Sequence, residues 1–244
     1  MVPTPLRISL IRALLTWWKD RRERQGLVSA LRMSVADVWE FLRDSTPERR
    51  RQRYGDVEYD WEYRMDTTSA TVGWRDRLLG LLHSPYQPTE PTLFEEMLAS
   101  LKIDFRNFTF IDLGSGKGRA LLLASAYPFR RIVGVELLPA LNRIAQENLQ
   151  NYKSARQQCF NVESIYGDAR EFVFPSEPIV LYLFNPLPAS GLSAVIANLE
   201  QSLREHPREF YVLYHNPILE HALGNSSPLR KIGGTHQYSI YRAE

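Results

Sequence analysis

Between residues 108 and 216 the chain alternates short β-forming runs with helical segments. Short apolar runs separated by helices are typical of a parallel sheet that is covered on both faces. The pattern therefore predicts an α/β fold. The predicted strands are 108–113, 131–137, 159–167, 178–185 and 209–216, and the predicted helices are 91–101, 118–127, 139–152 and 193–206.

The last part of the chain has a different pattern. Residues 229–243 hold two short β-rich runs around Gly233 and Gly234, and two adjacent glycines are a signal for a two-residue hairpin turn. We therefore expect the sheet to close with an antiparallel hairpin. A plain dinucleotide-binding fold would not end in this way.

Three regions are expected from the composition: a basic helical segment over 1–55, an aromatic and polar loop or lid over 56–90, and a main domain over 91–244. The formal net charge of +2 conceals an asymmetry, because 1–55 is rich in Lys and Arg whereas the remainder carries more acidic than basic residues. Long loops such as 56–90 are often functional.

The first 24 residues resemble a targeting segment, but the apolar run from Leu6 to Trp18 is too short to span a bilayer, which needs about 20 residues. Residues 6–24 are expected to form a helix that packs on the protein's own core or on a partner subunit. Peripheral contact with a membrane surface is the alternative, because apolar and basic residues lie close together there.

A glycine-rich loop follows the first predicted strand in "FTFIDLGSGKGR" (108–119). In an open α/β sheet, ligands bind at the carboxyl ends of the strands, and glycines let the backbone approach a ligand closely. This loop is the candidate ligand site, and its predicted contacts are Gly114, Ser115, Gly116 and Gly118. Lys117 and Arg119 are expected at the solvated start of the following helix.

This loop does not fit a phosphate site. Gly114 and Gly116 match the first two positions of the dinucleotide fingerprint, but the third falls on Arg119, and the P-loop pattern also fails. Asp112 lies at the mouth of the loop, where its carboxylate would repel a pyrophosphate. A carboxylate there suits a ligand that carries an amine.

Three more polar residues follow successive strands. Glu136 has the spacing of a carboxylate that accepts hydrogen bonds from ribose hydroxyls, and Asp168 could accept from an adenine amino group. Asn185 follows the fourth strand, where its amide could hold either a methyl acceptor or the methionine end of a cofactor. A nucleoside that carries an amine and no phosphate is therefore expected, and S-adenosylmethionine is the candidate.

The motifs "DLGSGKGR", "GVEL" and "GDAR" resemble those of the class I S-adenosylmethionine-dependent methyltransferases, over about residues 85–244. "FNPLP" (184–188) takes the place of the fourth motif. The resemblance implies a mostly parallel seven-stranded sheet whose last strand is inserted antiparallel, with helices on both faces. Residues 1–55 would then be an N-terminal helical extension.

Within that class the chain is most similar to the Dot1-like lysine methyltransferases and related bacterial proteins. "PYQPTE" (85–90) stands where that family has a tyrosine-led loop that closes over the cofactor. The resemblance makes Tyr86 and Thr89 candidate site residues, with Tyr86 and Asn185 nearest the chemistry. It implies methyl transfer to an acceptor that the sequence does not identify, such as a protein lysine.

Several alternatives stay open at this point. The acceptor could instead be a small molecule or a lipid, or the protein could be a non-catalytic scaffold that binds S-adenosylmethionine and docks on a membrane or partner. Nucleic acid is disfavoured because the run Asn185-Pro186-Leu187-Pro188 has no aromatic residue at its fourth position to stack on a base, and the excess of acid over 56–244 opposes such binding. No general base stands out, and the weak candidates are Tyr182, His215 and Asn216.

A metal site is not expected, because a single cysteine, Cys159, and five scattered histidines do not approach ligand spacing. The one cysteine cannot form an internal disulfide and is expected to be a buried thiol. These features favour a reducing, cytoplasmic setting, with the peripheral membrane alternative of residues 6–24 kept open.

Overall fold

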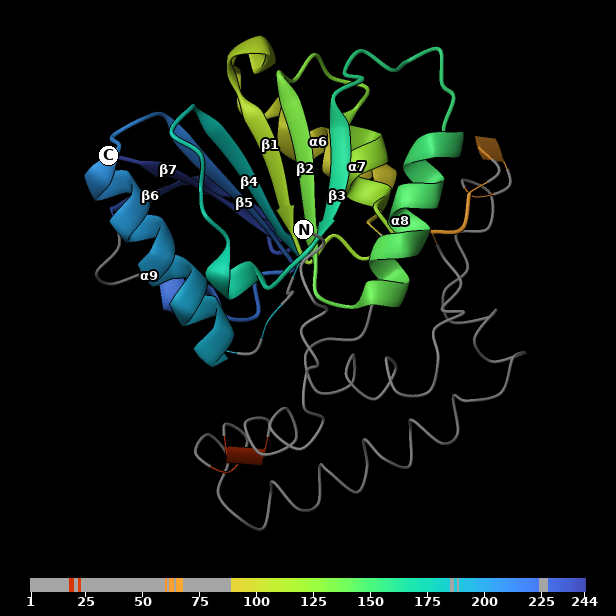
Figure 1. Cartoon of the computed structure of the whole chain (residues 1–244). Coiled ribbons are helices and arrows are strands. Elements are labelled where there is room, and N and C mark those ends of the chain that lie inside the picture. Colours follow the sequence, from red (N-terminus) through yellow and green to blue (C-terminus); the bar gives the residue numbers. More distant parts are fainter. Residues whose placement is uncertain are drawn as a thin grey trace.

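The computed structural model describes residues 18–19, 22, 60, 62–63, 65–67, 89–184, 187, 189–223 and 228–244. Within these residues a single sheet has the strand order β3-β2-β1-β4-β5-β7-β6 (Figure 1). The first five strands pair in parallel, and β7 lies antiparallel between β5 and β6. The predicted mixed sheet is therefore confirmed. The strands are β1 (Thr109–Leu113), β2 (Arg131–Glu136), β3 (Val162–Tyr166), β4 (Ile179–Phe184), β5 (Phe210–His215), β6 (Leu229–Gly234) and β7 (Tyr238–Ala243).

Helices cover both faces of the sheet. In Figure 1, α9 lies over the near face, and α6 and α7 lie behind the strands. Glu90 starts α6 by accepting hydrogen bonds from the backbone N–H groups of Thr92 and Leu93, which satisfies two donors that the first helical turn leaves free. The helices are α6 (Pro91–Ala99), α7 (Arg119–Ala124), α8 (Pro139–Asn151) and α9 (Ala189–Glu205), with short 3₁₀ turns η1 (Phe105–Asn107), η2 (Ala169–Glu171) and η3 (Glu220–Leu223).

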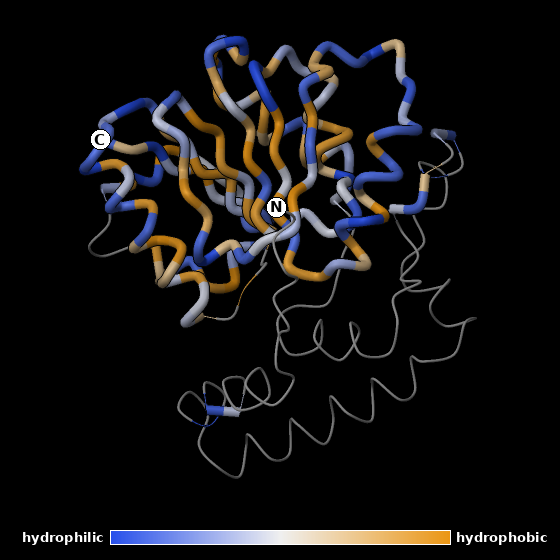
Figure 2. The backbone as a smooth tube through the Cα atoms, viewed as in Figure 1, coloured by the Kyte–Doolittle hydropathy of each residue, from blue (hydrophilic) through white to orange (hydrophobic). Residues whose placement is uncertain are grey.

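Two apolar clusters fill the two sides of the sheet. On one side Phe94 of α6 packs edge-on against Phe110 and Tyr182 of the strands. On the other side α9 contributes Leu192 and Leu199 to a cluster that includes Ile111. Successive residues of β1 thus serve opposite faces, as strand geometry requires. Figure 2 shows the resulting pattern of apolar strands and hydrophilic loops.

The turn of the C-terminal hairpin differs from the prediction. Gly233 and Gly234 are the last residues of β6 and pair with Ile240 and Ser239, so the turn itself lies at 235–237. Gly234 has φ 139°, and an added Cβ would lie 2.4 Å from the Tyr238 carbonyl oxygen. The glycine is therefore needed for a close approach of the two strands. Two-residue hairpin rules do not foresee this role, because it depends on a register shift between Lys231 and Gly233.

Several helices and strands begin or end at other residues than the sequence predicts. The helix predicted to reach 127 ends at Ala124, where the Ser125 hydroxyl donates to the carbonyl of Leu122 at 2.7 Å. The strand predicted from 159 begins at Val162, and the helix predicted from 193 begins at Ala189. Cys159 is buried, as expected.

The predictions for residues 6–24 and for the helices before residue 55 lie outside the described residues, apart from isolated positions. Those for 56–88 do so too, except near 60–67. No helix in the described part of the chain is both long and apolar enough to cross a bilayer.

Candidate functional site

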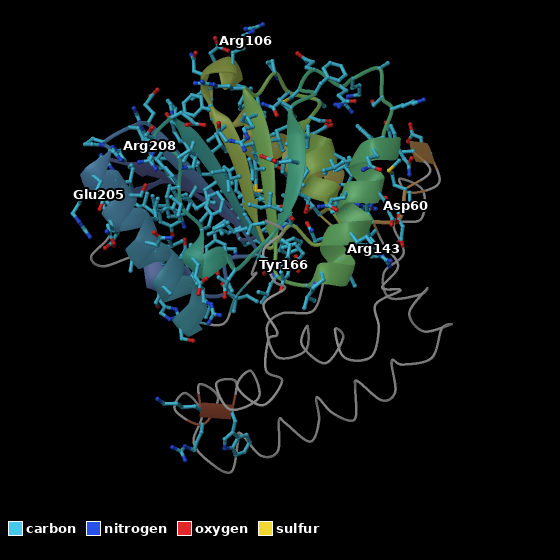
Figure 3. The ribbon with its side chains drawn as sticks, in the orientation of Figure 1. Asp60, Arg106, Arg143, Tyr166, Glu205 and Arg208 are labelled. Carbon is cyan, nitrogen blue, oxygen red and sulfur yellow. The ribbon has the colours of Figure 1, made fainter. Side chains whose placement is uncertain are left out.

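The candidate site lies where β1, β2 and β4 meet the loops at the carboxyl edge of the sheet. In the strand register, Asp112 of β1 stands between Gly134 of β2 and Tyr182 of β4. The carboxyl ends of the parallel strands lie at the lower edge of the sheet in Figure 1, and Tyr166, the last residue of β3, marks this edge in Figure 3. The topology therefore brings the predicted acids to one edge.

The glycine loop after β1 has a backbone that few other residues could adopt. Gly114, Gly116 and Gly118 have φ of 86°, 55° and 84°, in the left-handed region where a side chain is strained. The N–H groups of Gly114 and Ser115 donate to the Val135 carbonyl at 2.8 and 3.1 Å. The start of the loop is thus held on β2.

Gly134 in β2 makes room for this loop. A Cβ at Gly134 would lie 2.7 Å from the Ser115 hydroxyl oxygen and 2.6 Å from a methyl carbon of Leu121. Both distances are shorter than folded proteins tolerate, so Ser115 and α7 pack directly on the backbone of the strand. In the "GVEL" motif, Gly134 is therefore needed for packing, in addition to the acid Glu136.

Glu136 joins the loop to the second strand. Its carboxylate accepts from the N–H of Gly116 and from the N–H of Leu138, both at 2.8 Å. Burial raises the pKa of Glu136 to about 6, although hydrogen bonds from the backbone N–H groups of Leu138, Gly116 and Leu137 oppose the rise. Each carboxylate oxygen has a second lone pair, so acceptor capacity remains for ligand hydroxyls.

Asp112 is buried beside this carboxylate. Burial, and then the neighbouring Glu136 charge, raise the pKa of Asp112 well above its usual range. Two neighbouring buried carboxylates are costly, and a ligand amine would offset that cost.

Ser115 and the two acids give the loop the chemical character that S-adenosylmethionine needs. The hydroxyl of Ser115 is also buried and has no hydrogen-bond partner within the described part of the chain. A site with two acids, an unpaired hydroxyl and a turn of glycines suits a polar, cationic ligand that approaches the backbone closely. The residues present therefore fit the cofactor.

Asp168 lies two residues beyond β3, as predicted, but its carboxylate already has partners. It caps η2 by accepting from the Arg170 N–H at 2.9 Å, and the Arg170 guanidinium Nε lies 2.9 and 3.0 Å from its two oxygens. That the Asp168 carboxylate accepts a hydrogen bond from the adenine amino group stays a prediction. The adenine would share this carboxylate with Arg170.

A buried hydrogen-bonded chain joins Thr89 to β4 and β5. The Thr89 hydroxyl oxygen lies 3.2 Å from the Tyr182 phenol oxygen, which lies 2.7 Å from Nδ1 of His215. The imidazole stacks on Phe184 with ring centroids 3.9 Å apart. Burial lowers the pKa of His215 to about 4, although the charge of Glu90 opposes the shift, so the imidazole is neutral near pH 7.

This chain joins residues that sequence reasoning had treated separately. Thr89 was predicted as a cofactor contact and His215 as a weak base candidate, and Tyr182 connects them. Because the three residues come from different elements, no sequence spacing could have revealed the link.

The expectation for Lys117 and Arg119 was wrong. The side chain of Lys117 is 0% exposed and that of Arg119 is 2% exposed. Lys117 pairs with Asp66 at 2.6 Å and Arg119 with Asp60 at 3.2 Å, so acids from more than 50 residues upstream replace solvent. The sequence signal was weak, because a charged residue at a helix start is usually solvated.

Two predicted residues, Tyr86 and Asn185, lie outside the described residues, so their predicted roles remain predictions. Within the described part of the chain, no group of His, Cys, Asp and Glu side chains is arranged to hold a metal ion.

Comparison with known families gives one match. Residues 83–174 match the sequence model of the family described as "Histone methylation protein DOT1". This segment includes the glycine loop, Glu136 and Asp168. No curated protein sequence matches the chain closely enough to count as a relative.

Solved structures with a similar chain path include an RNA methyltransferase from Salinibacter ruber in complex with S-adenosyl-L-homocysteine. It is 25% identical, with a TM-score of 0.44, over 64% of this chain and 92% of that one. TrmN from Thermus thermophilus is 18% identical, with a TM-score of 0.44, over 63% and 48%. A ribosomal protein L11 methylase from Lactobacillus delbrueckii subsp. bulgaricus is 15% identical, with a TM-score of 0.41, over 63% and 76%.

The strand order has an antiparallel β7 inserted between β5 and β6, as the resemblance implies. The glycine loop and Glu136 stand together at the carboxyl edge of that sheet. The chain therefore has the Rossmann-like fold of the class I S-adenosylmethionine-dependent methyltransferases, and its residues 83–174 match the model of the histone methylation family.

Proposed function

We propose that this protein transfers a methyl group from S-adenosylmethionine to an amino group, such as that of a lysine side chain in a protein. The observation that carries the proposal is the buried pair Asp112 and Glu136 on either side of the glycine loop. Such a pair suits a nucleoside that carries an amine. The amine acceptor is supported by the match of residues 83–174 to a histone methylation family.

Each described residue has a separate part in holding the cofactor. Glu136 fixes the loop through the Gly116 N–H and keeps lone pairs for the ribose hydroxyls. Asp112 offers a desolvated negative charge to the amine of the methionine end. When bound, S-adenosylmethionine supplies a methyl group that is already activated on a sulfonium. Positioning and exclusion of water by the protein would therefore supply most of the rate.

The acceptor side is formed by the ends of β4 and β5. A neutral His215 avoids placing a second cation near a sulfonium, and its contacts with Tyr182 and Phe184 hold the imidazole in one orientation. Asn185 follows Phe184 directly, and we propose that it orients the acceptor while Tyr86 helps to close the site. An acceptor that arrives as a neutral amine needs no general base.

Residues 6–24 would contact a subunit or a membrane surface, and nucleic acid is not proposed as the acceptor. A small-molecule or lipid acceptor, or a scaffold that binds the cofactor without turnover, would each give a different result in the two experiments below.

Cofactor binding is tested by calorimetry with S-adenosylhomocysteine on the full-length protein. Asp112→Ala and Glu136→Ala should each weaken binding at least about tenfold, since each removes a charged, buried contact. Asp104→Ala, which removes the cap of η1 and an exposed pair with Arg106, should leave the affinity unchanged. Wild-type affinity in both site variants would rule out this site.

The acceptor is tested with methyl-labelled S-adenosylmethionine and lysate from cells that lack the protein. Label should appear on protein lysine with the wild-type enzyme and should be absent with Glu136→Ala. Label in lipid or small molecules would refute the protein-lysine acceptor. Binding without any transfer would favour the scaffold.

A further inference from the structure

Two basic side chains of the glycine loop are buried instead of solvated. Lys117 lies between Gly116 and Gly118, and Arg119 is the first residue of α7. Neither side chain is more than 2% exposed. A buried cation is stable only when other groups compensate its charge.

The compensating groups come from a short stretch far upstream. Asp66 pairs with the Lys117 ammonium at 2.6 Å, and Asp60 pairs with the Arg119 guanidinium at 3.2 Å. The Thr67 hydroxyl accepts from Arg119 Nε at 2.7 Å, and the Thr67 N–H donates to Asp60 at 2.8 Å. Figure 3 labels Asp60 on the side of the molecule where α7 and α8 lie.

Asn148 of α8 ties the backbones of both segments together. Its side-chain amide N–H group donates to the carbonyls of Asp66 and Lys117, both at 3.0 Å. Its oxygen accepts from the Asp66 N–H at 3.1 Å. Asn148 is buried, so these three hydrogen bonds belong to the packed interior of the protein. We call the six residues Asp60, Asp66, Thr67, Lys117, Arg119 and Asn148 the upstream latch.

The latch acts on the part of the loop that holds the candidate ligand site. Gly116 donates its N–H to Glu136, and its neighbour Lys117 is the latch residue in the loop. Glycines leave the backbone weakly specified, so contacts outside them must select the binding conformation. A contact that stabilises one loop conformation raises the affinity of any ligand that needs that conformation.

We propose that Asp60 and Asp66 are positioning residues for the cofactor loop, acting through Arg119 and Lys117. The inference rests on the proposed function for the identity of the ligand, but the order of the loop can be measured without any ligand. Asp60, Asp66 and Thr67 would then belong to the cofactor-binding machinery, although they precede the segment that matches the family. Cofactor binding and formation of the latch contacts are then linked, and each stabilises the other.

The test uses the full-length variants Asp60→Asn and Asp66→Asn in two measurements. Hydrogen exchange of the peptide that covers 112–122 should become faster in both variants without ligand. The affinity for S-adenosylhomocysteine should fall at least about tenfold, as expected for the loss of charged hydrogen bonds. Glu163→Gln, which breaks the Arg131–Glu163 pair between β2 and β3, is the control and should change neither readout.

A double-mutant cycle shows whether Asp66 acts through Lys117. Lys117→Met combined with Asp66→Asn should bind S-adenosylhomocysteine no more weakly than the worse single variant, because both remove one interaction. Unchanged exchange of 112–122 together with affinity within about twofold of wild type would overturn the proposal. If the wild-type protein binds no S-adenosylhomocysteine, the proposed function fails, and the exchange measurement alone decides on the latch.

Discussion

Asp112 shows how a binding residue can oppose folding. Its carboxylate is buried beside Glu136. Burial, and then the charge of Glu136, raise the pKa of Asp112 well above its usual range. An acid whose pKa is raised by folding is most compatible with the fold at low pH. Stability is lost as the pH rises through the folded-state pKa, because the buried group must then ionise. The ligand-free protein therefore carries a cost that a cationic ligand would offset.

Replacing Asp112 with Asn should separate the cost of the buried carboxylate to folding from its contribution to ligand binding. We expect the ligand-free variant to melt at a higher temperature than wild type at pH 8, with the difference shrinking towards pH 4, where the wild-type carboxyl is protonated. The rise in melting temperature on adding S-adenosylhomocysteine should disappear. Differential scanning fluorimetry across this pH range measures both. A variant that melts lower than wild type at pH 8 would contradict the argument.

Among the elements, β2 contributes two residues to the ligand site. It carries Glu136 at its end, and it carries Gly134 under the glycine loop, where Ser115 and Leu121 pack on its bare backbone. The loop and α7 can approach the sheet only because that position has no side chain. The shape of the ligand site is thus set by packing between elements as well as by the loop itself.

Gly134→Ala should therefore displace the loop. Because the added methyl group would lie under 3.0 Å from Ser115 and Leu121, we expect a loss of about 1–3 kcal/mol in stability by urea unfolding. The affinity for S-adenosylhomocysteine should fall as well. Gly233→Ala is the control, since an added Cβ there meets nothing closer than 4.0 Å. Equal effects of the two substitutions would argue against a special role for Gly134.

At the scale of the whole molecule, the C-terminal hairpin is held to η3 by one carboxylate. Glu220 accepts from the Lys231 ammonium at 2.7 Å, the Ser239 hydroxyl at 2.6 Å and the Tyr241 phenol at 2.8 Å. These groups, the Lys231 hydrogen bond foremost, lower the pKa of Glu220 to about 2. The group is 39% exposed, so solvent screens much of the interaction.

Glu220→Gln should lower the stability by up to about 1 kcal/mol at pH 7, the upper range for exposed pairs. A depressed acid pKa stabilises the fold above the unfolded value of about 4, and this contribution is lost as the pH falls towards about 2. The difference between wild type and variant should thus be smaller at pH 3 than at pH 7 in urea unfolding. A difference that does not depend on pH would refute this role, and Glu244→Gln is the matched surface control.

Much of this fold could be predicted from local pattern. Alternating apolar runs and helices reflect backbone periodicities that any segment expresses on its own, and parallel pairing then brings the strand ends to one edge. Asp112 and Glu136 were found in this way. The antiparallel insertion of the last strand came from a family resemblance, and the full strand order came from the structure, because local pattern does not specify which strands pair.

The sequence by itself determined the α/β class, the glycine turn after β1 and the acids at its mouth. Only the tertiary structure decided that Lys117 and Arg119 are buried, since their partners Asp60 and Asp66 lie more than 50 residues away. It likewise decided the Thr89–Tyr182–His215 chain and the turn at 235–237. Burial of a charge depends on which distant groups surround it, and a local pattern carries no record of that environment.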